Sequence, residues 1–176
     1  MITIVKKSVT KLGTDAVVNA ANEHLKAGGG VCGTIFREAG YEELEDACDD
    51  IMFCKTGSAV VTPAFALDAK IIIHAVGPIW SGGKNQEPQL LYSCYMKSLE
   101  LAKENECASI GFPLISAGIY GYPMDKAWTK ALQACMDFEK RNADLEMKIV
   151  FGVLSDDVLM MGYDIMKELE QKQEQQ

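Results

Sequence analysis

The stretch Val17-Val18-Asn19-Ala20-Ala21-Asn22 is followed closely by Gly28-Gly29-Gly30-Val31-Cys32-Gly33. The first stretch is typical of a buried strand that ends in two asparagines, and the second opens a helical pattern with three consecutive glycines. Glycine lets a backbone approach a ligand closely, and a helix start offers unpaired N–H groups and a positive dipole end. The pair predicts a strand–loop–helix unit with an anion site, most naturally for a phosphate. For the glycines alone, a flexible loop with a helix cap remains the alternative.

Apolar runs typical of strands recur along the chain, and most of them are continuously apolar. Continuous runs favour a sheet that is covered on both faces. The predicted strands are Ile2–Val5, Ala16–Asn19, Ala59–Thr62, Ile71–Val76, Ser109–Phe112 and Lys148–Leu154.

Helical patterns separate these runs, which predicts a three-layer α/β/α sandwich around a mixed, roughly six-stranded sheet. Helices are predicted over Cys32–Ala39, with Gly40 as C-cap, over Tyr41–Met52, and around Leu91–Ala102, Met124–Phe138 and Val158–Leu169. We expect a single domain over residues 1–170 and a disordered tail over 171–176.

The composition excludes several function classes. The 176 residues carry a formal net charge of −8, so the chain has no general attraction for nucleic acids or anionic lipids. It has no apolar run of the ~18–20 residues that cross a bilayer and no signal-peptide layout at its start, and we expect a cytoplasmic protein. Six scattered cysteines without a C-x-x-C pair are expected to be free thiols, and two histidines give no basis for a metal site.

A second loop, Phe112–Pro123, also follows a strand and precedes a helix. Its sequence includes Ser116-Ala117-Gly118-Ile119-Tyr120, in which the Ser116 hydroxyl and the backbone N–H groups around Gly118 can donate to a phosphate. Two such loops at one sheet edge suit the diphosphate of a nucleotide diphosphate sugar. Neither loop has a Walker A or G-x-G-x-x-G pattern, which disfavours dinucleotide oxidoreduction. We expect Tyr122 to be a packing residue.

The chain resembles the macrodomain family over nearly its whole length. The matching segments, in the family's order and spacing, are Asp15–Asn22, Gly28–Val31, Thr56–Ala59, Ile72–Pro78 and Gly118–Pro123. The resemblance implies a cleft for ADP-ribose, with the diphosphate between the two glycine loops. In hydrolytic members it implies removal of ADP-ribose from modified side chains, or conversion of related ADP-ribose esters.

Three positions depart from the family's pattern. Ser8 stands where many members have an Asp that accepts a hydrogen bond from adenine, although the N–H of Val9 can still contribute. Leu154 stands where an aromatic often stacks on adenine. Cys32 stands where many hydrolytic members have an Asp thought to help activate water, so a general base there cannot be assumed. We expect Cys32 to fill space beside the ligand, the alternative being a thiol activated by the helix start.

The resemblance implies a catalytic set of Asn22, Gly30 and Gly118, with Asn22 positioning the distal ribose; in the alternative, Asn22 only stabilises the loop backbone. His74, inside an apolar run, is expected to be a core histidine. The predicted ligand shell is Ser8, Val9, Ala21, Asn22, Gly29, Gly30, Val31, Cys32, Ser116, Ala117, Gly118, Ile119, Tyr120 and Leu154.

The resulting hypothesis is a monomeric macrodomain that needs no cofactor. It binds ADP-ribose or a mono-ADP-ribosylated protein and hydrolyses mono-ADP-ribose linkages on acidic residues or small ADP-ribose esters. The replacement of Asp by Cys32 favours the first alternative, a reader that binds ADP-ribose without turnover. The second alternative is binding of another nucleotide.

Overall fold

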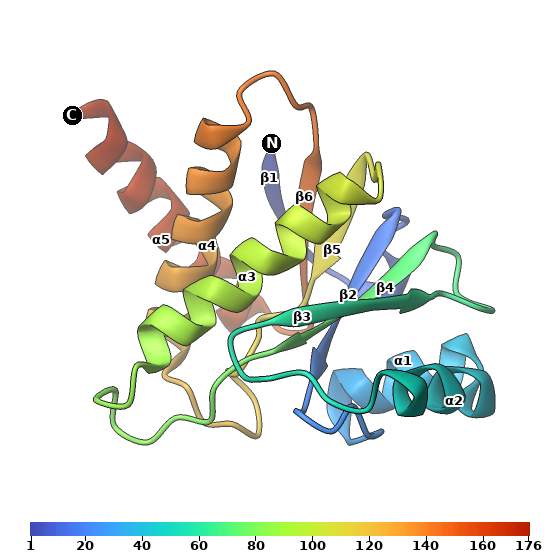
Figure 1. Ribbon diagram of the computed structural model, residues 1–176. Coiled ribbons are helices and arrows are strands. Elements are labelled where there is room, and N and C mark those ends of the chain that lie inside the picture. The colour runs from blue at the N-terminus through green and yellow to red at the C-terminus, as the bar shows by residue number, and fades with distance from the viewer.

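Six strands form one mixed sheet in the order β1-β6-β5-β2-β4-β3 in the computed structural model, which describes residues 1–176 (Figure 1). Five strands run parallel, and β3 pairs antiparallel with β4 at one edge. The strands are β1 (Ile2–Lys6), β2 (Ala16–Ala21), β3 (Ala59–Pro63), β4 (Ile71–Val76), β5 (Ser109–Phe112) and β6 (Lys148–Val153). Each predicted strand is present, and the predicted mixed α/β fold is confirmed.

Burial along the strands explains their order in the sheet. The strands β2 and β4 lie inside the sheet and are almost wholly buried. The edge strands β1 and β3 mix buried with partly or fully exposed residues, as expected where only part of a strand is covered. A sheet covered on both faces agrees with the prediction from the continuously apolar runs.

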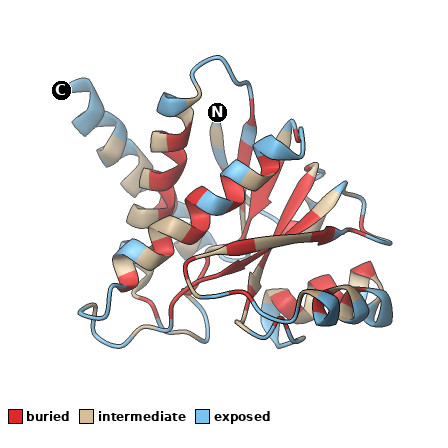
Figure 2. Cartoon of the chain, in the orientation of Figure 1, coloured by how far each residue is buried: buried red, intermediate tan, exposed pale blue.

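Helices cover both faces of the sheet (Figure 1). One face carries α1 (Gly30–Ala39) and α2 (Tyr41–Ile51), and the other carries α3 (Glu87–Glu104), α4 (Met124–Arg141) and α5 (Asp156–Glu174). Each face has its own apolar core, and buried residues line the inner sides of the helices (Figure 2). A short 3-10 helix, η1 (Val9–Lys11), has no counterpart in the sequence prediction.

Several helix boundaries differ from the prediction by a few residues, and two of these differences bear on the predicted site and tail. α1 begins at Gly30 rather than Cys32, so the last of the three glycines is its first residue. α5 continues to Glu174, into the segment 171–176 that we expected to be a disordered tail. None of the five helices combines the length and apolar character that crossing a bilayer requires.

Parallel strands place their carboxyl ends at one edge of the sheet. The segments that follow β2, β4, β5 and β6 therefore start from the same edge. Ligands of open α/β sheets bind beyond these ends, and both glycine loops of the sequence lie there.

Candidate functional site

A cleft of about 490 Å³ lies between the two glycine loops, within the size range of small-molecule sites. None of its lining side chains is acidic, basic or histidine, although the chain as a whole is strongly negative. The lining residues are Ser8, Val9, Ala20, Ala21, Asn22, Gly28, Gly29, Gly30, Val31, Cys32, Thr34, Gly77, Pro113, Leu114, Ile115, Ser116, Gly118, Ile119, Tyr120, Gly152 and Leu154.

A second hollow lies between α4 and α5, with a volume of about 610 Å³. Asp125, Asp157, Asp164 and Glu168 make up half of its eight lining residues. Their negative charges repel an anionic ligand, so a phosphate ligand fits the uncharged cleft and not this groove.

The first glycine loop ends at the start of α1. Gly29 is the N-cap, and no side chain caps the helix, so its first N–H groups lie unpaired at the positive end of the helix dipole. Gly30 has φ +57°, a conformation that favours glycine. A Cβ on Gly33 would lie 2.7 Å from the carbonyl oxygen of Gly28, so the loop folds closely over the first turn. The predicted anion site therefore faces the cleft.

The Asn22 side chain holds the backbone of this loop. Its Oδ1 accepts a hydrogen bond from the N–H of Lys26 (3.1 Å), and its Nδ2 donates to the Lys26 carbonyl (2.9 Å). The structure thus gives Asn22 the loop-stabilising role that we considered as the alternative. Asn22 also lines the cleft, and one amide hydrogen stays free for a ligand.

The second loop presents a row of backbone donors. The N–H groups from Ser116 to Tyr120 donate to no protein acceptor, whereas Gly121 and Tyr122 donate back into the loop. The loop is fixed at Tyr120, whose carbonyl accepts the N–H of Trp80 at 2.9 Å. An anion in the cleft would find unpaired donors on both of its sides.

The hydroxyl of Ser116 differs from the expectation. We expected it to donate to a phosphate, but it donates to the carbonyl of Pro78 at 2.8 Å. The residue is buried with φ +68°, and a Cβ on Gly77 would lie 2.3 Å from its Oγ. Because Gly77 has no side chain, the Ser116 hydroxyl has room to reach the Pro78 carbonyl, and the contribution of Ser116 to the cleft is its backbone.

At the end of the cleft that lies away from Asn22, η1 lies against β6. A Cβ on Gly152 would lie 2.7 Å from the carbonyl oxygen of Lys7, so only glycine admits this approach. The Ser8 hydroxyl is engaged with that of Thr10 (3.0 Å), and Leu154 is 72% exposed. This end therefore offers a short hydroxyl and an aliphatic surface to a ligand.

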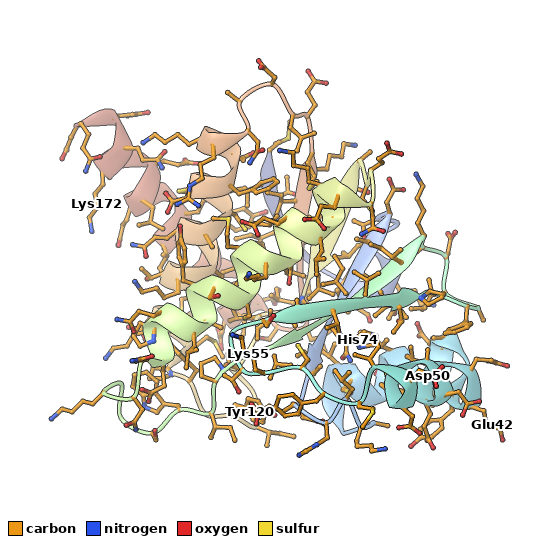
Figure 3. The ribbon with its side chains drawn as sticks, in the orientation of Figure 1. Glu42, Asp50, Lys55, His74, Tyr120 and Lys172 are labelled. Carbon is orange, nitrogen blue, oxygen red and sulfur yellow. The ribbon has the colours of Figure 1, made fainter.

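The remaining side chains of interest lie as follows. His74 is fully buried, which confirms a core histidine, and Figure 3 shows it on the side of the sheet that faces α1 and α2. Burial, with Glu23 and Cys32 nearby, raises the pKa of Tyr120, which lines the cleft. Tyr122 is buried against Trp80, with ring centroids 4.7 Å apart, which confirms its packing role. All six cysteines are free and buried.

The cleft brings together every residue of the predicted ligand shell except Ala117, which packs against the core. Eight further residues line the cleft that the sequence prediction did not include. Gly28 and Gly77 lie in the segments that carry the family resemblance, and this signal could have found them. Ala20 lies in such a segment as well, in Asp15–Asn22, whereas Thr34, Pro113, Leu114, Ile115 and Gly152 lie outside all of them.

Comparisons with known proteins agree with this geometry. The family described as Macro domain matches residues 18–131. A macro domain-containing protein of Chlorobaculum tepidum is 45% identical over 156 residues, which cover 89% of this chain and 90% of the relative. An O-acetyl-ADP-ribose deacetylase of Salmonella typhimurium is 48% identical over 144 residues, or 80% of each protein.

Among solved structures, the Oceanobacillus iheyensis macrodomain with ADP has a TM-score of 0.90 at 37% identity, covering 96% of this chain and 91% of that one. Sequence and structure thus agree over most of both chains. Because the family match spans most of the residues and these relatives align over nearly their full length, the chain belongs to the macro domain family.

Proposed function

We propose that this chain binds ADP-ribose in the cleft and hydrolyses ADP-ribose esters. The substrates are small esters such as O-acetyl-ADP-ribose, or the ester that links mono-ADP-ribose to an acidic side chain. The observation that carries the proposal is the pairing of two sets of unpaired backbone N–H groups, at the start of α1 and from Ser116 to Tyr120, around one uncharged cleft.

The two sets of donors suit the two phosphates of a diphosphate. The adenosine then extends toward Ser8, Val9 and Leu154, and the distal ribose toward Asn22 and Cys32. A relative of 48% identity named O-acetyl-ADP-ribose deacetylase and a macrodomain of 37% identity solved with ADP support this ligand class.

The chemistry that fits this cleft is positional. Water attacks the carbonyl carbon of the ester, the bond between that carbon and the ribose oxygen breaks, and a proton of the water passes to the ribose oxygen, so that a carboxylic acid and ADP-ribose leave. The lining has no carboxylate or imidazole to act as base, so the backbone donors hold the diphosphate and a phosphate oxygen of the substrate orients the water. Asn22 contributes by fixing the loop and by offering its free amide hydrogen to the ribose hydroxyls.

The test is to incubate the protein with O-acetyl-ADP-ribose and, separately, with a peptide mono-ADP-ribosylated on a glutamate. Released ADP-ribose is quantified by chromatography, and binding of ADP-ribose is measured by calorimetry on the same preparation. Release from either substrate above the uncatalysed rate supports the hydrolase. Absence of both release and binding contradicts the whole proposal.

A second candidate is a reader that binds ADP-ribose and does not turn it over. The observation that favours it is Cys32, a thiol at the position where the family's hydrolytic members often carry a carboxylate. Binding in calorimetry without release from either substrate would establish the reader.

A further inference from the structure

A chain of buried polar side chains runs through the sheet beneath the first glycine loop. Thr62, His74 and Asn19 come from the neighbouring strands β3, β4 and β2, and each exposes 2% or less of its surface. Asn19 and His74 are direct partners in the register of β2 and β4. Buried polar groups destabilise a core unless they are hydrogen-bonded. The hydrogen-bond partners of these three side chains therefore indicate their structural role.

The hydrogen bonds among these three side chains all donate in one direction, from Asn19 through His74 to Thr62. Burial lowers the pKa of His74 to about 4, so the ring is neutral at pH 7 and has one donor and one acceptor nitrogen. The Asn19 Nδ2 group can only donate, so His74 Nδ1 accepts from it at 3.1 Å. The proton is therefore on Nε2, which donates to Thr62 Oγ1 at 2.9 Å, and Thr62 donates to the Pro63 carbonyl at 3.1 Å.

The same Asn19 amide reaches the cleft through Cys32. Its Nδ2 also donates to Cys32 Sγ at 3.7 Å, and the Cys32 thiol donates to the carbonyl of Lys26 at 3.8 Å. That carbonyl also accepts from Asn22. The residues that lead into the three glycines are thus held by the Asn22 side chain and, through Cys32, by the sheet.

The orientation of Asn19 leaves its own carbonyl oxygen, Oδ1, without any partner. A buried unpaired carbonyl is destabilising. With the amide turned over, its oxygen would face His74 Nδ1 and Cys32 Sγ, and a hydrogen bond to His74 would need the ring proton on Nδ1. The orientation of the Asn19 amide and the position of the proton on His74 are therefore coupled.

We propose that Asn19 and His74 are positioning residues, which hold Cys32 and the first glycine loop in the geometry that receives the ligand. The imidazole, fixed by Thr62, orients the Asn19 amide. The amide then fixes the Cys32 side chain against Lys26. This inference rests on the proposed function for the identity of the ligand, whereas the coupling of His74 to Cys32 is a property of the chain alone.

The test compares Asn19→Leu, His74→Leu and Thr62→Val with Cys48→Ala as matched control. The Cys48 thiol is also buried and makes a longer, weaker hydrogen bond to His74 Nε2, at 4.0 Å against 2.9 Å for Thr62 Oγ1, and it has no bond to Cys32 or the loop. Thr62→Val is nearly isosteric, so it keeps the test open if a leucine variant does not fold. It removes only the oxygen that holds the proton on Nε2, two strands away from the cleft.

Two readouts are measured at a temperature where every variant is folded by circular dichroism. These are the affinity for ADP-ribose by calorimetry and the alkylation rate of Cys32 by peptide mass spectrometry. Asn19→Leu, His74→Leu and Thr62→Val, which we call the relay variants, each interrupt the hydrogen bonds that lead from Thr62 to Cys32. We expect each of them to bind ADP-ribose about tenfold more weakly and its Cys32 to be alkylated about tenfold faster, as is typical when residues that support a binding site are lost. The Cys48→Ala protein should match the unmodified protein in both. Relay variants with an unchanged Cys32 alkylation rate would overturn the proposal.

Nitrogen chemical shifts of the His74 ring give a signature that simple destabilisation does not produce. The unmodified protein should show the Nε2-protonated form, and Thr62→Val should shift the proton toward Nδ1. An Nδ1-protonated ring in the unmodified protein also overturns the relay. If the unmodified protein does not bind ADP-ribose, the proposed function fails, while the alkylation rates and ring shifts still decide the coupling.

Discussion

The side chain of Asn22 and the backbone of Lys26 form a closed pair of hydrogen bonds, Lys26 N–H to Oδ1 and Nδ2 to the Lys26 carbonyl. The pair turns the residues after β2 back on themselves before the three glycines begin. An asparagine can make this pair because its amide offers one acceptor and one donor side by side. The geometry of the anion site at the start of α1 therefore depends on a side chain that also lines the cleft.

Replacing Asn22 by alanine should loosen the first glycine loop. Two hydrogen bonds are lost, each with a net contribution on the order of 1 kcal/mol, and the loop must be ordered when the ligand binds. We expect about tenfold weaker binding of ADP-ribose in calorimetry, with little change in the unfolding temperature because the loop is exposed. Asn22→Asp keeps the bond from the Lys26 N–H but not the donor, and its charge repels the diphosphate. An affinity for Asn22→Asp above that of Asn22→Ala would contradict this account.

Gly118→Val separates binding from folding at the second loop. A Cβ at Gly118 meets no atom within 4 Å, so the side chain enters open space and leaves the fold intact. The same side chain occupies the cleft beside the unpaired N–H groups of the loop. We expect ADP-ribose affinity to fall by about a hundredfold or more, equal to about 2.8 kcal/mol. Urea unfolding should stay within about 0.5 kcal/mol of the unmodified protein, and unchanged affinity would remove this loop from the site.

The sheet could be predicted from the sequence because its strands are short, apolar and separated by helical patterns. Ile71–Val76 agrees residue for residue with β4. The sequence prediction ends β2 too early, at Asn19, because Ala20 and Ala21 are small and give only a weak apolar signal. Pairing across the sheet with Ala75 and Val76 carries the strand on to Ala21. Boundaries set by neighbouring strands in this way are not encoded locally.

The site was predictable at its glycines and less so at its polar side chains. The glycines between a strand pattern and a helix pattern predicted where backbone N–H groups are open to a ligand, and both loops do line one cleft. The hydroxyl of Ser116 turns to Pro78, a residue 38 positions away in the chain, and no local pattern contains that contact. The same holds for the relay from His74 to Cys32, which depends on three strands being neighbours.

Cys32→Asp should increase ester hydrolysis if the cleft lacks only a base. The aspartate would stand in the first turn of α1, where the helix dipole favours a negative charge, within reach of the Asn19 donor that now faces Sγ. A positioned carboxylate can accept the proton of the attacking water, an effect typically worth about a hundredfold. We expect kcat for O-acetyl-ADP-ribose to rise by about tenfold or more. KM should rise as well, because the carboxylate repels the diphosphate.

Cys32→Asn is the matched control for this substitution, since it has the shape of aspartate without its charge. It should leave kcat near that of the unmodified protein. Equal rates for the two variants would mean that a carboxylate at this position does not act as a base, and that the substrate's own phosphate orients the water.

Glu87 should make the stability of the protein sensitive to acid, because it anchors the backbone of residues 81–85 next to the second loop. Its carboxylate is buried and accepts from the backbone N–H groups of Ser81 (2.8 Å), Gly83 (2.9 Å) and Asn85 (2.6 Å). Burial alone would raise the pKa of Glu87, but these N–H groups favour the charged form and lower the pKa from 4.5 to about 2. The stabilisation is therefore fully present above pH 4.5 and is lost as the pH falls toward 2.

Glu87→Gln tests this directly, with Glu100→Gln on the exposed side of the same helix as control. The free energy of unfolding in urea should be lower for Glu87→Gln at pH 7, and the difference from the unmodified protein should shrink as the pH falls below 4.5. ADP-ribose affinity should also weaken at pH 7, because Trp80 precedes the anchored segment and donates to the Tyr120 carbonyl. The Glu100→Gln protein should show neither effect. A pH-independent loss of stability in Glu87→Gln would mean that the side chain acts through its packing, since a carboxylate that acts through its charge must lose its advantage when it is protonated.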